Sequence, residues 1–284
     1  MSIFNHLKSG IERSLKSWKC ILIIWFSSLL LVTLFAQPLK SGINNIMGSS
    51  MITEKLNNGF DLDVIANTGT GFLPVLSAFS SGLILVILTG FLMNVFFSGG
   101  LFSVLSNSDN RIKISHFFSG AASNFWSFLI IEVLLLLIIA FLITALMVVP
   151  VIIARGAESE KTVLVTLKTT AIILLFILPV VLLVADYSRS WQVVTEKKDP
   201  FAAVGIGFRR TFGRFLVSYL IMALIIIIQF LFTWLVFKLI AGMKPISGGG
   251  VFLLFLLSQF SVILKTGLRV WRYGSVTSLF ERQP

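Results

Sequence analysis

Two charged side chains inside apolar sequence are the strongest functional signal in this chain. Glu132 interrupts the apolar run 125–153, and Lys265 lies near the end of the run 250–268. At about 1.5 Å of rise per helical residue, they lie about 10 Å and 5 Å from the same membrane face, within reach of each other. Because charge is costly in lipid, such residues are paired, hydrated or functional. We favour structural pairing of Glu132 with Lys265 or with surface arginines over a proton or ion relay.

Four further polar residues lie in or at the ends of apolar runs. Asp186 and Arg189 are three residues apart, on one helical face, where they can pair with each other or with nearby arginines. Gln229 and Gln259 fall near mid-depth of two adjacent runs. A side-chain hydrogen bond between these glutamines is the structural interpretation, and a substrate contact at the membrane midplane is the functional one.

Residue patterns that indicate catalysis are scarce. The two histidines, His6 and His116, are isolated from each other and from the single cysteine, so a zinc site is not indicated. The chain has neither a Walker phosphate-binding loop nor a G-x-S-x-G nucleophile elbow. Asp61 and Asp63 are better explained as hydrated loop carboxylates than as metal ligands. We therefore expect no catalytic residues, no cofactor, no metal and no enzymatic activity.

The elements that position these residues follow from composition. Of the 284 residues, 56% are hydrophobic and 12% are charged, whereas soluble domains carry about a quarter charged residues. Continuous apolar runs without alternation predict an all-α membrane bundle and exclude a barrel. We predict a single membrane domain, residues 1–284, with an external loop at 37–71. Its six transmembrane helices are 20–36, 72–97, 125–153 (with Pro150 kinking or ending the third), 162–185, 215–239 and 250–268.

Amphipathic helices are predicted at the membrane surface in 1–19 and 199–214. Asp199 is an N-cap and Pro200 suits the first helical position. Apolar residues repeat at spacings of 3, 4, 4 and 3 from Phe201 and again from Phe4, which indicates one helical face. A weaker copy starts at Ile114, so the chain could consist of three repeated units of interfacial helix and helical hairpin. The lipid-headgroup contacts that we predict are Arg209, Arg210 and Arg214.

The basic residues predict the orientation. Sixteen of the 23 lysines and arginines fall on the side that holds both termini, and cytoplasmic loops carry such an excess. We therefore expect a multi-pass protein of the bacterial inner membrane with cytoplasmic N- and C-termini. The net charge of +11 is explained by topology and anionic headgroups rather than by nucleic acid. The expected partners are membrane lipids, with a protein partner or a second copy also possible.

The segments "DYSRSWQVVTEKKDPFAAVGIGFRRTFGRF" and "GGLFSVL…FFSGAASNFWSFL" carry a resemblance over most of the chain from about residue 73. The layout resembles bacterial six-span membrane proteins without assigned activity. It is similar to the membrane domain fused to some glycerophosphodiester phosphodiesterases. The resemblance implies the fold but no site residues, because this sequence contains no phosphodiesterase domain. We expect a non-enzymatic scaffold or accessory protein that organises a membrane complex or local lipid; the alternative is a transporter or channel for a lipid or small solute.

Overall fold

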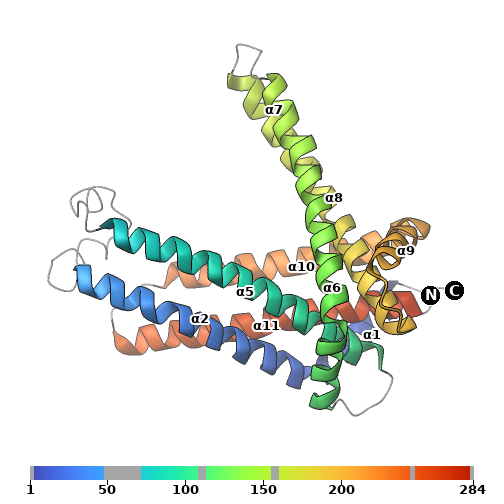
Figure 1. Cartoon of the computed structure of the whole chain (residues 1–284), viewed down its shortest axis with the longest axis horizontal. Helices are drawn as coiled ribbons and strands as arrows, with labels where there is room; N and C mark the ends of the chain where they lie inside the picture. The colour runs from blue at the N-terminus through green and yellow to red at the C-terminus, as the bar shows by residue number, and fades with distance from the viewer. Residues whose placement is uncertain (1–2, 48–71, 108–112, 155–159, 244–246, 282–284) are drawn as a thin grey trace. The chain divides into compact units, whose positions relative to one another are not determined.

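The computed structural model of the chain describes residues 3–47, 72–107, 113–154, 160–243 and 247–281. Within these ranges the secondary structure is helical, and six helices are long and apolar enough to cross a membrane (Figure 1). The predicted fold class, a multi-span all-α membrane protein, is confirmed. The chain divides into two compact units, one formed by Met1–Leu22 with Val95–Pro284 and the other by Ile23–Asn94.

Six long helices contain the spans, and shorter helices precede or follow them. The long helices are α2 (Trp18–Met47), α5 (Phe72–Ser106), α6 (Ile114–Ile143), α8 (Glu160–Thr195), α10 (Phe215–Gly242) and α11 (Gly248–Glu281). The shorter α-helices are α1 (Ile3–Lys16), α7 (Val149–Ala154) and α9 (Pro200–Gly213). Each predicted span falls on one of the long helices, the third of them continuing through α7.

Besides α2, whose extension is described below, three helices continue well beyond the predicted ends of their spans. We predicted ends at residues 97, 185 and 268, but α5, α8 and α11 run on to Ser106, Thr195 and Glu281. The added turns are rich in buried polar residues such as Ser188 and Thr277. These helices go on because their added turns pack against protein: α8 contacts α9, and α11 contacts α1.

The third span does not end at Pro150, but its backbone is irregular just before this proline, where we predicted a kink or an end. The α-helical pattern of α6 ends at Ile143, and a π-helical segment, Thr144–Val148, connects it to α7. Proline has no N–H to donate and its ring clashes with the preceding turn, so the backbone widens locally to accommodate it. The span therefore keeps a helical course through a proline without a complete break.

The unit Ile23–Asn94 consists of most of α2 and the larger part of α5. Hydroxyl groups on α2 bond within the helix: Ser28 Oγ donates to the Ile24 carbonyl at 2.8 Å, and Thr33 Oγ1 donates to the Leu30 carbonyl at 2.9 Å. Such bonds satisfy hydroxyl groups in lipid. Because α2 reaches Met47, the first part of the predicted 37–71 loop is helix. Residues 48–71, including Asp61 and Asp63, lie outside the described residues.

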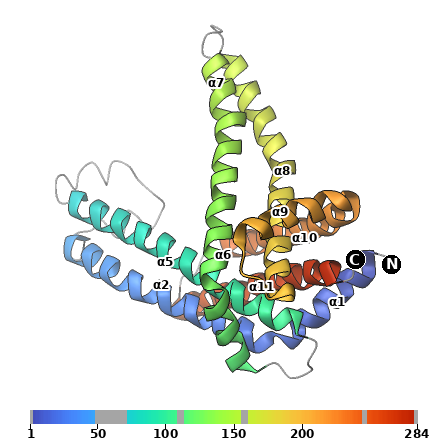
Figure 2. The ribbon, with the colours of Figure 1, turned by 45° about the vertical axis from the view of Figure 1, so that its right-hand side comes forward.

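Both predicted amphipathic helices form, as α1 and α9. The Asp199 carboxylate accepts hydrogen bonds from the Phe201 and Ala202 N–H groups, each at 3.1 Å, which confirms the predicted cap. The helix α1 packs against the end of α11, and α9 packs against the end of α8 (Figures 1 and 2). The third predicted copy is not a separate helix, because residues 114–143 form one uninterrupted α6.

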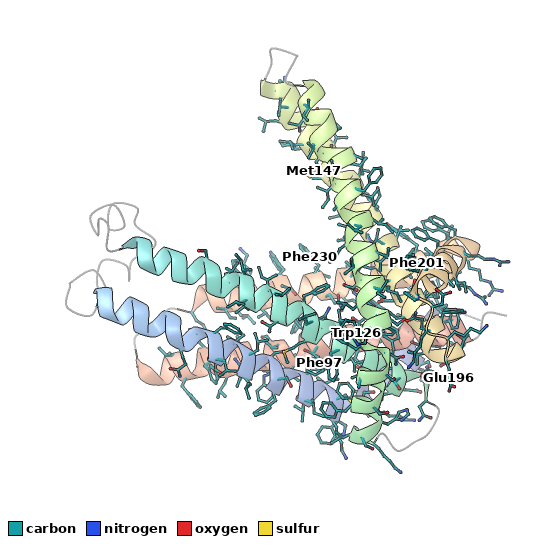
Figure 3. The ribbon with its side chains drawn as sticks, viewed as in Figure 1. Phe97, Trp126, Met147, Glu196, Phe201 and Phe230 are labelled. Carbon is teal, nitrogen blue, oxygen red and sulfur yellow. The ribbon has the colours of Figure 1, made fainter. Side chains whose placement is uncertain are left out.

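The face of α1 and α9 that contacts the protein consists mostly of small residues, with His6 as the exception. In α9 the buried residues are Ala203, Gly207 and Thr211, while Phe201 is 68% exposed and projects away from the ribbon (Figure 3). In α1 the buried residues are His6, Gly10 and Ser14. Small side chains let helices approach closely. The aromatic stripe that we predicted therefore faces the surroundings, as an interfacial helix requires.

The same kind of glycine–serine contact occurs between three pairs of helices. A side chain added at Gly10 would meet Ser275 of α11, one at Gly120 of α6 would meet Ser103 of α5, and one at Gly207 would meet Ser188 of α8. Each glycine lies six residues after the first residue of its predicted apolar stripe. The same close approach at the same register supports the threefold repeat, with α11 and α1 completing the third pair across the chain ends.

These contacts form one packed region, which we call the terminal bundle. It is defined by α1, α9, and the residues 95–106 of α5, 114–128 of α6, 181–195 of α8 and 266–281 of α11.

Candidate functional site

A buried network of four charges lies in the terminal bundle and adjoining turns of α6. The Asp186 side chain is fully buried, and its Oδ2 lies 2.9 Å from Arg272 Nε of α11. Its Oδ1 lies 3.5 Å from Arg189 Nη1, one turn away on α8. Arg189 also pairs with Glu132 of α6. Two carboxylates and two guanidinium groups thus alternate and balance, which is what burial of charge requires.

The network confirms one predicted ion pair and corrects another. Asp186 and Arg189 pair with each other, as their spacing indicated. We expected Glu132 to pair with Lys265 or with surface arginines. Lys265 was wrong, because it is exposed on α11, and the partner is an arginine, although a buried one, Arg189 of α8. The physical reason is the packing of α6 against α8. Depth in the membrane narrowed the choice of partner for Glu132, but only helix adjacency decided it.

Arg272 is the member of the network that the sequence did not reveal. In the sequence it is one of the sixteen basic residues on the side that holds both termini, which only predict the orientation, yet its side chain is 11% exposed. Its guanidinium carbon lies 5.0 Å from the ring centroid of Tyr273, and the Tyr273 ring packs on Phe102 of α5 at 4.7 Å. The only sequence signal was its position beyond a long apolar run, which it shares with exposed arginines.

Apolar clusters lie on both sides of the buried charges of α8. One cluster includes Leu183, Tyr187 and Ile221, and the other includes Ile131 and Val184. The Tyr187 hydroxyl lies 2.7 Å from Ser218 Oγ of α10, so its polar group is satisfied. This packing buries Asp186 and Arg189, and a buried ion pair depends strongly on keeping all of its partners.

Neutral hydrogen bonds add to the polar contacts between helices. Gln192 Nε2 donates to Ser127 Oγ of α6 at 2.5 Å. Ser190 Oγ lies 3.3 Å from Thr277 Oγ1 of α11. His6 Nδ1 lies 3.2 Å from Ser278 Oγ, which joins α1 to α11. These bonds and the ion network fix α1, α6, α8 and α11 in one register.

A polar cavity of about 750 Å³ opens within the terminal bundle. Its lining includes His116 and Asn124 of α6, Gln192 and Glu196 at the end of α8, and Glu281 of α11. Gln192 is 2% exposed, and its Oε1 atom has no hydrogen-bond partner within the described residues. Glu281 is engaged by Arg13 of α1 at 2.6 Å. A buried acceptor with spare capacity suits a ligand or partner that carries a hydrogen-bond donor.

The remaining predicted residues lie apart from this network. Gln229 and Gln259 are half-buried on α10 and α11; the hydrogen bond between them stays a prediction. Arg209 and Arg214 are exposed, as headgroup contacts must be. The Arg210 guanidinium instead lies 5.5 Å from the ring centroid of Phe280, so protein as well as lipid positions it.

Metal-ligating residues do not cluster in the described ranges, where no three histidine, cysteine or carboxylate side chains gather. No protein-family model, curated protein or solved structure matches the chain. The resemblance to the membrane domain of some glycerophosphodiester phosphodiesterases stays a prediction.

Proposed function

We propose that this polytopic membrane protein is a non-enzymatic component that organises a membrane complex and receives a partner segment at the terminal bundle. The observation that carries the proposal is where the buried charge lies. Asp186, Arg189 and Arg272 gather at the ends of α8 and α11, beyond the most apolar parts of those helices. A transporter uses polar groups near the membrane midplane. Charged groups at the helix ends instead stabilise the packing of the helices in the terminal bundle.

The apolar stretches of the helices support the same proposal. Large side chains are exposed along them, for example Leu175 and Phe176 on α8 and Phe230 on α10, which projects from the ribbon (Figure 3). Such faces are covered by lipid or by the helices of another protein. The terminal bundle then positions the helices, and their outer faces remain available to neighbours in the membrane.

The polar cavity is the place where we propose that the partner docks. The free Gln192 Oε1 accepts a donor such as a peptide N–H, and the nearby Glu196 and Lys198 offer charges of both signs. A segment with mixed polar character fits this lining better than an apolar helix does. A peptide segment bound here would contact α5, α6, α8 and α11 together. Its binding would therefore depend on how these four helices are positioned relative to one another.

Site-specific photo-crosslinking in native membranes tests this proposal. A photoreactive phenylalanine analogue replaces Val194, which lines the cavity and is 39% exposed; the control replaces Trp234 of α10, which is 52% exposed. We expect one dominant protein adduct from position 194, absent from position 234 and abolished by a second change, Ser123→Trp, that fills the cavity. An adduct pattern shared by both positions, or unaffected by Ser123→Trp, would contradict partner docking here.

We further propose that the terminal bundle faces the cytoplasm of a bacterial inner membrane. The support is the excess of lysine and arginine on this side. The single cysteine, Cys20, is buried, so we expect it to react little with thiol reagents, and labelling then reports on a newly introduced cysteine. Arg209→Cys, on an exposed position of α9, should resist a membrane-impermeant thiol reagent in intact cells and react after lysis. Labelling in intact cells would reverse the orientation.

Transport of a lipid or small solute is the second candidate. The observation that favours it is the threefold recurrence of the glycine–serine contact, because transporter folds are often built from repeats. The half-buried Gln229 and Gln259 would then contact substrate near the midplane. Reconstituted protein that moves a solute or lipid between leaflets, with activity lost in Gln229→Leu but retained in an exposed control such as Leu231→Ala, would establish transport.

A further inference from the structure

An apolar groove of about 510 Å³ lies between α1, the start of α2 and one face of α11. Its walls include Leu15 and Trp18 on one side and Leu264, Leu268 and Trp271 on the other. All of these residues belong to one compact unit of the chain. The groove is separate from the polar cavity, with which it shares no lining residue.

Two hydrogen bonds join the two walls of the groove and satisfy polar groups there. Ser14 Oγ donates to the Gly267 carbonyl at 3.0 Å, which holds α1 against α11 at a residue without a side chain. Trp271 Nε1 donates to the Leu7 carbonyl at 3.0 Å. The indole N–H is therefore satisfied by protein, and the ring offers an apolar surface. The floor at Gly267 stays open because nothing projects from it.

Basic residues follow lining residues of the groove in the sequence, and Lys19 Nζ lies 5.8 Å from the ring centroid of the lining residue Trp18. Lys16, Lys19 and Lys265 directly follow the lining residues Leu15, Trp18 and Leu264 in the sequence, and all three side chains are exposed. The groove lies where the interfacial helix α1 passes into the span on α2, the depth at which headgroups meet acyl chains. An apolar slot edged by several cations is complementary to an anionic lipid, with a chain in the slot and a phosphate at the rim.

We propose that this groove is a binding site for an anionic phospholipid, with one acyl chain between α1 and α11 and the headgroup on Lys16, Lys19 and Lys265. The bound lipid would contact both α1 and α11 and would stabilise their packing, beside the hydrogen bond between Ser14 and Gly267. The inference rests on the membrane placement of these helices. It does not depend on the partner-docking proposal, whose cavity is elsewhere.

The test uses the purified full chain, delipidated in mild detergent and then given phosphatidylglycerol or phosphatidylcholine with identical acyl chains. Native mass spectrometry measures the retained lipid. Wild type should retain one phosphatidylglycerol with about tenfold or greater preference over phosphatidylcholine, as three nearby lysines imply. Equal retention of the two lipids by wild type would overturn the proposal.

A pair of matched glycine substitutions separates the groove from general lipid adhesion. A Cβ atom at Gly267 would meet only Ile21 Cδ1, at an ordinary 3.9 Å, so the backbone leaves room for a side chain there, and we expect Gly267→Leu to fill the slot. Gly205→Leu adds the same side chain to α9, where nothing lies within 4 Å. Gly267→Leu should reduce phosphatidylglycerol retention about tenfold or more, and Gly205→Leu should not. Equal effects of the two substitutions on lipid retention would contradict the assignment. It would also be contradicted if the wild-type protein were a dimer that Gly267→Leu dissociates, because a second copy would then occupy the groove.

A charge variant tests the headgroup side without touching the packing. Lys16→Gln, Lys19→Gln and Lys265→Gln together should abolish the preference for phosphatidylglycerol while binding of phosphatidylcholine stays the same. An unchanged preference would place the headgroup elsewhere. The Val194 crosslink described above should survive in all of these variants, so failure of the lipid site and failure of partner docking give different results.

Discussion

The two halves of α8 follow opposite rules. From Leu164 to Leu178 the helix exposes its large apolar side chains, with Leu175 at 69%. From Val181 to Gln192 it buries nearly everything, including the charged Asp186 and Arg189. In one half of this helix the apolar side chains are exposed on the protein surface, and in the other half polar side chains are buried within the protein. Burial of apolar surface cannot drive packing in lipid, which is itself apolar, so small residues, hydrogen bonds and ion pairs determine where helices associate.

The contrast predicts where the protein is fragile. Asp186→Ala should produce the largest loss, about 3–5 kcal/mol, because it leaves the guanidinium groups of Arg189 and Arg272 buried with one carboxylate fewer. Equilibrium unfolding in detergent measures the free energy of unfolding. The control is Asp199→Ala, which removes the exposed cap of α9 and should cost only about 1 kcal/mol. Similar losses for the two variants would show that the network does not stabilise the bundle.

A leucine pair within α8 tests the comparison directly. Leu183 is 1% exposed and belongs to the core cluster with Tyr187, so Leu183→Ala should cost about 2–5 kcal/mol through lost contacts and a cavity. Leu175→Ala makes the same chemical change where the side chain faces the surroundings, and detergent or lipid replaces the missing contact. Its effect should be close to zero. A large loss at Leu175 would reveal that a second copy or partner covers this half of α8.

Two glycines on α9 should respond with opposite signs. An alanine Cβ at Gly207 would lie 2.6 Å from the Val184 carbonyl oxygen, so Gly207→Ala should destabilise by about 1–3 kcal/mol through overpacking. Gly205 has open space around it, so Gly205→Ala should stabilise α9 by about 0.5–1 kcal/mol through its higher helix propensity. Thermal unfolding in detergent gives both values.

The same substitution extends the test to the threefold repeat. Gly10→Ala and Gly120→Ala meet Ser275 and Ser103, so each should resemble Gly207→Ala in sign and size. Three similar losses would indicate that the helix pairs are equivalent packing units. If only Gly207→Ala lowered the stability, the equivalent positions of the three glycines would not reflect equivalent contributions to packing.

Periodicity and hydropathy sufficed to predict the helical class, the spans and the cap at Asp199, because these features depend on local sequence. They failed where distant segments meet. The pairing of Asp186 with Arg272 joins residues 86 positions apart, and nothing near Arg272 distinguishes it from a solvated surface arginine. The small-residue faces were also missed, because the more hydrophobic aromatic stripe dominates the pattern of α9. In an interfacial helix that stripe faces lipid, and the less conspicuous face carries the packing.

Within the buried charge network, the smallest effect on folding is expected at Glu132, where the two functional candidates also separate. Glu132→Gln keeps an acceptor for Arg189, and Asp186 still balances part of the charge, so the loss should be about 1 kcal/mol. The side chain is also less buried than that of Asp186, at 21% against 0%. As a component of a complex, the variant should insert, fold and give the Val194 crosslink like wild type. Proton flux in proteoliposomes provides the opposing readout: substrate-dependent flux in wild type that disappears in Glu132→Gln would make this carboxylate a relay and would favour transport.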